Sequence, residues 1–266
     1  MHNVNRIHLI CGGRFHDFDL ARLTLLKIMA EQESVRCTCA NHFRDVDRLD
    51  GVNGIILYNC DLLPDESQTT ALDAFVNRGG RIFALHATNA PIEFTDGPSI
   101  VASGVHIPGL VKVPTAEISP RYMSLLGSRF VAHLASQAFT VNVVDADHEL
   151  TRGLNDFAVT DEPYVSEMLS DVRVLLSARY KGDAPGYVKA KFADDPPRPQ
   201  LYVKDHGRGS VAYLTLGHSC GRFDLRPMVE EVAPVRGPWD DPNYQELLRR
   251  GICWIGKAAE SAGQST

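Results

Sequence analysis

The sequence predicts an α/β protein, a three-layer sandwich in which a mostly parallel central sheet lies between two layers of helices. Short apolar runs alternate with stretches of helical period through the first half of the chain, as strands joined by helical crossovers do. Two apolar runs, one in each half, end in a histidine. In open α/β sheets the carboxyl ends of the strands carry the ligand, so the same observations predict where a site lies.

The elements expected in the first half follow one another closely. Strands are predicted at 6–11, 35–40, 54–58 and 81–86, and helices at about 18–32 and 65–77. Pro64 and Asp65 are typical of the start of the second helix, whereas Gly79 and Gly80 end it before the next strand. Right-handed crossovers between such strands place helices on both faces of a parallel sheet.

The second half alternates less clearly. Strands are expected at 139–144, 172–178, 201–204 and 210–216, and an amphipathic helix near 244–258. Between the halves, five prolines punctuate a region at 89–138, which we expect to be a loop-rich insertion. Beside a strand-end site, such a segment is either a lid or pocket wall, or a solvated surface excursion. One domain over 1–266 accounts for these elements, with a flexible tail at 259–266.

Composition points to a small ligand. The 266 residues carry a net charge of -6 with no concentrated block of Lys and Arg, so neither nucleic acid nor an anionic membrane is an expected partner. No apolar run approaches the roughly 20 residues that span a bilayer, and we expect a cytoplasmic protein. The amphipathic last helix suits a monomer core and a homo-oligomer interface equally well.

The six cysteines indicate no metal knuckle or redox pair, because none of them forms a C-x-x-C motif. Cys220 follows His218 closely and could be a site thiol, although free cysteine is more often a small buried hydrophobe. His86 and His218 are the two strand-end histidines. An imidazole there can act as a general base, donate a hydrogen bond to a carbonyl oxygen, or bind a metal.

Several motifs together resemble those of ThuA-like (trehalose utilisation) proteins, whose fold is similar to the flavodoxin-like, class I glutamine amidotransferase domain. The motifs lie at 12–16, at 79–87, at 127–133, at 148–154, at 157–164 and at 207–218. They span nearly the whole chain, in the expected order. The resemblance implies a role in carbohydrate catabolism, with a small-molecule sugar as substrate and a sugar oxidoreductase as a partner in the same pathway.

The resemblance also implies that the protein is not a glutaminase. A glutamine amidotransferase needs a cysteine at the turn after this strand to form its thioester, and His86 stands there. The related proteins accompany oxidoreductases that produce 3-keto sugars. A ketone makes the neighbouring C–H bond acidic, so a base and an oxyanion stabiliser can drive isomerisation, elimination or hydrolysis.

We assign expected roles on this basis. His86, His218 and Glu162 are the catalytic candidates for acid–base chemistry. Substrate contacts are expected from His16, His133, Asp161 and Tyr164, the last by stacking under a sugar ring. Alternative readings remain: His16 and His148 could serve a helix start or a turn, Asp161 could cap a turn, and Glu162 could pair with an exposed arginine.

The sequence requires no cofactor, but a divalent metal such as zinc is an open alternative. His16, His86, Glu162 and His218 would form an acceptable set of nitrogen and oxygen ligands. No H-E-x-x-H helix is present, so loops would have to assemble such a centre. A non-catalytic sugar-binding or regulatory protein on the same scaffold is the second functional hypothesis.

Overall fold

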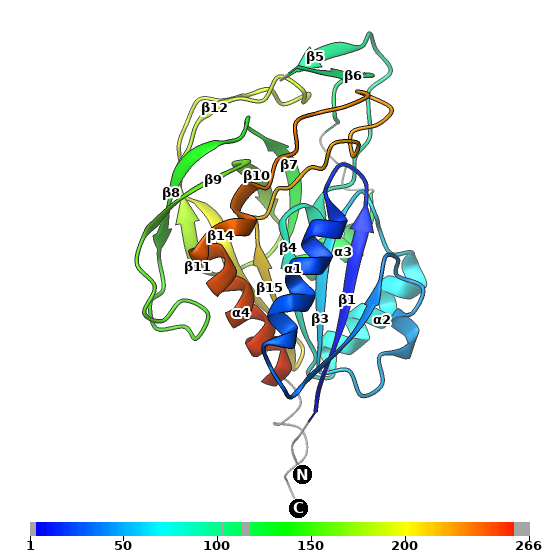
Figure 1. The fold of residues 1–266 in the computed structure, drawn as a ribbon, viewed down its shortest axis with the longest axis vertical. Helices are drawn as coiled ribbons and strands as arrows, with labels where there is room; N and C mark the ends of the chain where they lie inside the picture. Colours follow the sequence, from blue (N-terminus) through cyan, green and yellow to red (C-terminus); the bar gives the residue numbers. More distant parts are fainter. Residues whose placement is uncertain (1–3, 103, 113–117, 258–266) are drawn as a thin grey trace, which may run out of the picture.

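Nine strands drawn from almost the whole chain form one sheet in the computed structural model, which describes residues 4–102, 104–112 and 118–257. Across the sheet the order is β2 (Val35–Ala40), β1 (Asn5–Gly13), β3 (Gly54–Cys60), β4 (Arg81–Leu85), β15 (Gly209–Leu214), β14 (Arg198–His206), β11 (Arg173–Ala178), β8 (Gln137–Val143) and β9 (Phe157–Asp161). Figure 1 shows the blue-to-cyan strands of the first half beside the yellow and green ones of the second.

The sheet is mixed rather than mostly parallel. β2, β1, β3, β4 and β15 pair in parallel, as the strand–helix alternation predicts. From β15 onward the pairs through β14, β11, β8 and β9 are antiparallel. The change to antiparallel pairing begins between β15 and β14 because a tight hairpin joins them, with His206 opposite Gly209, and leaves no room for a crossover helix.

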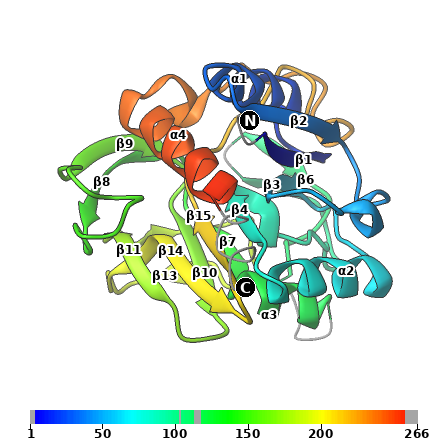
Figure 2. The same ribbon diagram turned by 90° about the horizontal axis from the view of Figure 1, so that it is seen from below.

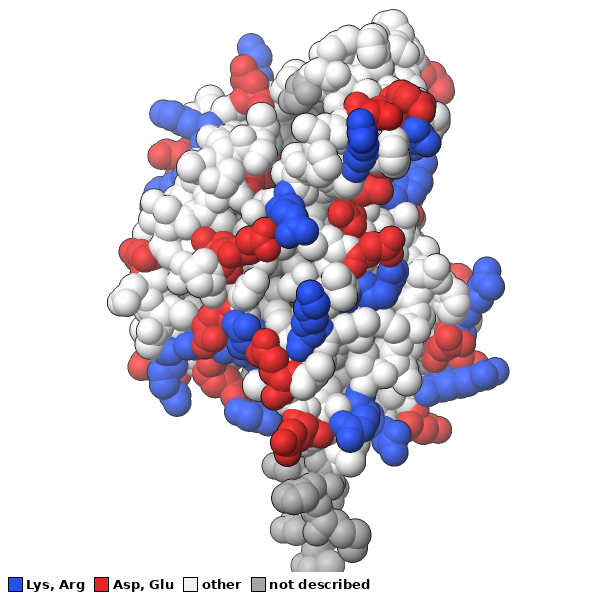
Figure 3. Space-filling view, viewed as in Figure 1, with Lys and Arg blue, Asp and Glu red and all other residues white. Residues whose placement is uncertain are grey.

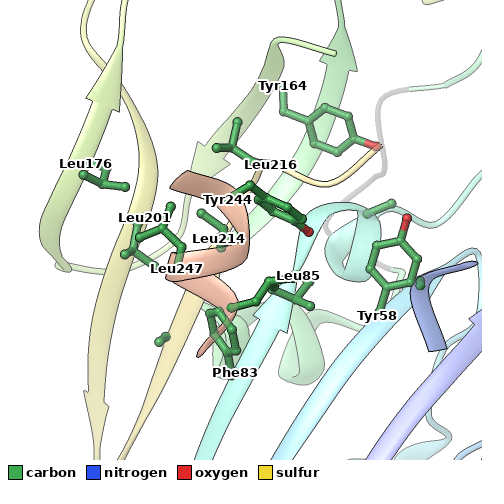
Figure 4. Packing of buried hydrophobic residues seen from close by; sticks show 14 of the residues in the cluster. Tyr58, Phe83, Leu85, Tyr164, Leu176, Leu201, Leu214, Leu216, Tyr244 and Leu247 are labelled. Carbon is green, nitrogen blue, oxygen red and sulfur yellow. The ribbon is translucent and has the colours of Figure 1, made fainter. Parts of the chain in front are cut away.

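Helices cover both faces, as expected. Figure 2 shows α1 (Phe18–Ala30) and α4 (Pro242–Gly256) on one side of the sheet, and α2 (Glu66–Asn77) and α3 (Pro120–Leu126) on the other. Asp17 and Asp65 cap α1 and α2 by accepting backbone N–H groups of the first turn. The core beneath α4 is seen in Figure 4, where Tyr244 and Leu247 lie over side chains of β4 and β15.

The region at 89–138 is only partly the loop-rich insertion that was expected. Its first part carries a small hairpin of β5 (Ile100–Ala102) and β6 (Val105–Ile107), whereas its second part holds α3 and β7 (Ser128–His133). The regular structure forms there because α3 buries four apolar side chains under the sheet. β7 pairs with β10 (Tyr164–Met168) in a separate ladder.

One further strand pair completes the fold. β12 (Gly182–Asp183) and β13 (Lys191–Phe192) form a short ladder. The flexible tail predicted at 259–266 lies outside the described residues. On the face in Figure 3, acidic and basic side chains are interspersed and form no patch of one sign. None of the helices described is long and apolar enough to cross a membrane.

Gly251 allows α4 to lie close to β4, and its replacement should destabilise the fold. A Cβ atom there would stand 2.1 Å from Cε1 of Phe83, a ring that is 1% exposed. We expect Gly251→Ala to lower the free energy of unfolding by about 1–3 kcal/mol through overpacking, despite alanine's better helix propensity. Chemical denaturation measures this, with Cys253→Ala on the exposed side of α4 as control. Equal midpoints for Gly251→Ala and wild type would contradict the prediction.

Candidate active site

The candidate site lies at the carboxyl ends of the parallel strands. His16 follows β1, His86 follows β4 directly, and His218 lies four residues beyond β15. Glu162 comes from the turn between β9 and β10, far from the histidines in sequence. The sheet order therefore brings together the two strand-end histidines that the sequence singled out, and it adds His16 and Glu162.

His86 occupies a strained backbone turn. Its φ of 48° lies in the left-handed region, which is uncommon for a residue with a side chain. The Tyr213 hydroxyl donates a hydrogen bond to the carbonyl oxygen of His86 at 2.6 Å. Gly217 packs against the same turn at φ 132°, where a Cβ atom would approach His86 Cβ to 3.3 Å. The neighbouring strand thus holds the turn in place.

Backbone carbonyls fix which imidazole nitrogens carry protons. The Nδ1 atom of His86 lies 2.9 Å from the carbonyl oxygen of Thr215, and that of His133 lies 2.9 Å from the carbonyl of Leu134. A carbonyl only accepts, so each Nδ1 donates and each Nε2 keeps a lone pair. A weaker contact of the same kind, at 3.3 Å, orients His16. Such outer hydrogen bonds are typical of metal-binding and catalytic histidines.

Four side chains converge on one point. One potential ligand atom from each of His16, His86, Glu162 and His218 lies within 4.8 Å of the other three. Glu162 Oε2 is 3.2 Å from His218 Nδ1 and 3.9 Å from His86 Nε2. Nε2 of His16, Nε2 of His86 and Nδ1 of His218 are buried and have no hydrogen-bond partner among the described residues. Unpartnered buried nitrogens that face one carboxylate fit a divalent cation.

Burial sets the protonation of these groups. It lowers the pKa of His16 and of His133 to about 4, and it lowers that of His86 well below the ordinary value. Neighbouring His16 and His218 lower the pKa of His86 further. Burial also raises the pKa of Glu162 to about 8. The imidazoles are therefore neutral at pH 7, which is the form that binds a metal or accepts a proton. Glu162 is mostly protonated at the same pH, and a bound cation would displace its proton.

Asp161 lies behind the site rather than in contact with the cavity. Its side chain is fully buried and accepts the backbone N–H groups of Gly217 at 2.7 Å, His218 at 3.1 Å and Glu162 at 2.8 Å. The expected substrate contact is thus a residue that positions two site segments. The turn-capping alternative describes its hydrogen bonds better than substrate contact does.

The remaining candidates divide between the cavity and other places. Tyr164 and His133 line the cavity, and the Tyr164 ring lies 4.3 Å from the His86 ring between centroids. Glu162 faces histidines and not an exposed arginine. His148 accepts the N–H of Leu150 within a local turn, as its alternative reading held. Cys220 lines the cavity, but burial raises the pKa of its thiol to about 12, so the thiolate is scarce at neutral pH.

A cavity of about 470 Å³ adjoins the centre. The segment after β4 supplies one wall, through residues such as Ile92, Phe94 and Ile107, so this part of the insertion is a pocket wall and not a surface excursion. Sequence reasoning missed the other walls, which come from 184–187 and from 225–235. The sequence signal within them is a few turn residues, Pro185 and Gly186 in the first and two prolines in the second, and such residues carry no information about what a loop faces.

Fold and site together define an α/β protein with a histidine–glutamate centre at the carboxyl ends of its parallel strands. The family model for ThuA, described as trehalose utilisation, matches residues 13–232, and the chain therefore belongs to this family. It is a protein related to carbohydrate utilisation. A comparison with curated proteins finds no match.

Solved structures share the fold. A ThuA-like protein from Parabacteroides merdae ATCC 43184 is 17% identical, with a TM-score of 0.61, over 99% of this chain and 93% of that one. A ThuA-like protein from Bacteroides uniformis ATCC 8492 is also 17% identical, with a TM-score of 0.63, over 96% and 93%. A cold-adapted β-galactosidase from Rahnella sp. R3 is 15% identical, with a TM-score of 0.52, over 96% of this chain and 32% of that one. The expected α/β fold of ThuA-like proteins is confirmed.

The hydrogen bonds of Asp161 predict that its carboxylate stabilises the fold. Asp161→Asn replaces one acceptor oxygen by an NH₂ group that faces a backbone donor, so we expect a loss of about 1–3 kcal/mol in the free energy of unfolding. Thermal or chemical unfolding measures it, with the exposed Asp171→Asn as the matched control. A variant as stable as that control would show that the three backbone contacts contribute little.

Proposed function

We propose that this protein is an enzyme that acts on a keto-sugar or a related glycoside, with a divalent cation held by His16, His86, Glu162 and His218. One observation carries the proposal: three buried imidazole nitrogens, none with a hydrogen-bond partner in the described part of the chain, converge on the carboxyl group of Glu162 beside a cavity. Family membership supports a sugar as the substrate. A bound cation would polarise the oxygen of a substrate carbonyl.

In this proposal His133, which the sequence predicts to be a substrate contact, moves the proton. It lines the cavity on the side of Glu162, and its Nδ1–H is engaged by the Leu134 carbonyl, so Nε2 keeps a lone pair. In the proposed reaction Nε2 takes the proton from the carbon next to the ketone, and the electron pair moves onto the ketone oxygen. For isomerisation, the proton returns to the former carbonyl carbon, and the hydroxyl proton on the deprotonated carbon moves to the former ketone oxygen. For elimination, the ketone re-forms, a C=C bond forms, and the group on the next carbon leaves with its bonding pair and takes the proton from His133.

The metal proposal predicts binding that depends on the four ligands. Chelator-treated wild-type protein titrated with Zn²⁺ should take up about one ion per chain and unfold at a higher temperature. At a free Zn²⁺ concentration of one hundred times Kd, the free energy of unfolding should rise by about 2.7 kcal/mol. Elemental analysis and thermal unfolding are the measurements. His86→Ala and Glu162→Gln should lose the ion, whereas His148→Ala should keep it. Equal metal content in all four proteins would overturn the assignment.

The catalytic proposal predicts conversion of a 3-keto-disaccharide, followed by NMR over time. Wild-type protein should produce new sugar signals, and His133→Ala should lower kcat by about 100-fold or more because the base is lost. His148→Ala is the control outside the cavity. Broadened but unchanged substrate signals with wild-type protein would instead support the non-catalytic sugar-binding function.

A further inference from the structure

The cavity beside the histidine–glutamate centre has two unlike parts. His16, His133, Glu162 and His218 supply the polar groups. Most of the remaining wall consists of aliphatic and aromatic side chains from segments far apart in sequence. Among them are Ile92, Phe94, Ile107, Leu225, Met228 and Val232.

A free disaccharide would find few partners in this wall. Its second ring carries hydroxyl groups, and a hydroxyl that leaves water without gaining a hydrogen bond weakens binding. Among the described lining residues, Ser136, Tyr164 and Tyr187 add hydroxyls, and no Asp, Asn, Gln, Lys or Arg is present. The same lack of cationic side chains leaves a sugar phosphate without a counter-charge.

Aromatic rings continue the apolar surface up to the centre. Tyr187 lies 5.2 Å from the His133 ring and 5.7 Å from the Phe130 ring, and Phe130 lies 4.7 Å from Tyr164, between centroids. Such rings pack against planar apolar groups in offset or edge-on arrangements. The polar groups therefore suffice for one sugar ring, and the rest of the cavity suits an apolar group attached to it.

We infer that the substrate is a glycoside with an apolar aryl aglycone, whose sugar ring binds at the histidine–glutamate centre and whose aglycone packs on the apolar wall. The inference rests on the proposed function for the sugar half. The cavity volume of about 470 Å³ is that of a pocket which holds a drug-sized ligand. The cavity then selects substrates by the apolar group attached to the sugar ring rather than by a second sugar.

Two 3-keto-glucosides that differ only in the leaving group, 4-nitrophenol in one and glucose in the other, provide the test. Wild-type kcat/KM should be at least about tenfold higher for the aryl glucoside. Phe94→Ser should lose about tenfold on that substrate and keep its kcat/KM on the disaccharide. Phe223→Ser is the matched control, because Phe223 is 47% exposed and does not line the cavity.

Equal kcat/KM on both substrates, or an equal loss on both in Phe94→Ser, would overturn the inference while the proposed function stands. If neither substrate is converted, the wall assignment is tested by measuring the binding of 4-nitrophenyl glucoside and of glucose by calorimetry. If wild-type protein binds the aryl glucoside more tightly than glucose, and Phe94→Ser weakens that binding, the wall assignment is supported although the proposed chemistry fails. Binding without that preference, or no binding, would overturn it.

Discussion

The buried carboxylate of Asp161 is the interaction on which the arrangement of the site depends. It stands at the end of β9, the last strand of the antiparallel half, and it holds backbone groups of the loop that leaves β15 in the parallel half. It also holds the N–H of Glu162. One side chain thus sets the distance between the glutamate and His218, which no contact within a single element could do.

The parallel half of the fold could be predicted from the sequence because each strand contains a short, largely apolar run and the helices have clear end signals. Asp65 and Gly79 are examples. β9 and β10 were missed because strands of five residues with alternating burial resemble loops when their partners are unknown. α3 was missed because its seven residues follow a proline-rich stretch, and packing under the sheet rather than a long periodic pattern fixes it.

The site residues, too, could be predicted only in part from the sequence. His86 and His218 were found because they end strands that the pattern predicted. Whether Asp161 faces the cavity and whether Glu162 meets histidines depended on pairing between distant strands, which sequence spacing does not reveal. Burial and neighbouring imidazoles lower the pKa of His86 and of His218 well below the ordinary value, so both rings are neutral and keep a lone pair at neutral pH.

The walls of the cavity and its polar floor belong to different kinds of structure. The floor stands on strand ends and on the ladder of β7 and β10, whereas most of the apolar wall comes from connecting segments. Connecting segments accept substitutions and changes of length far more readily than strands do. Substitutions in those segments can therefore change the shape of the cavity while the polar floor stays the same, a separation that makes the scaffold readily adaptable.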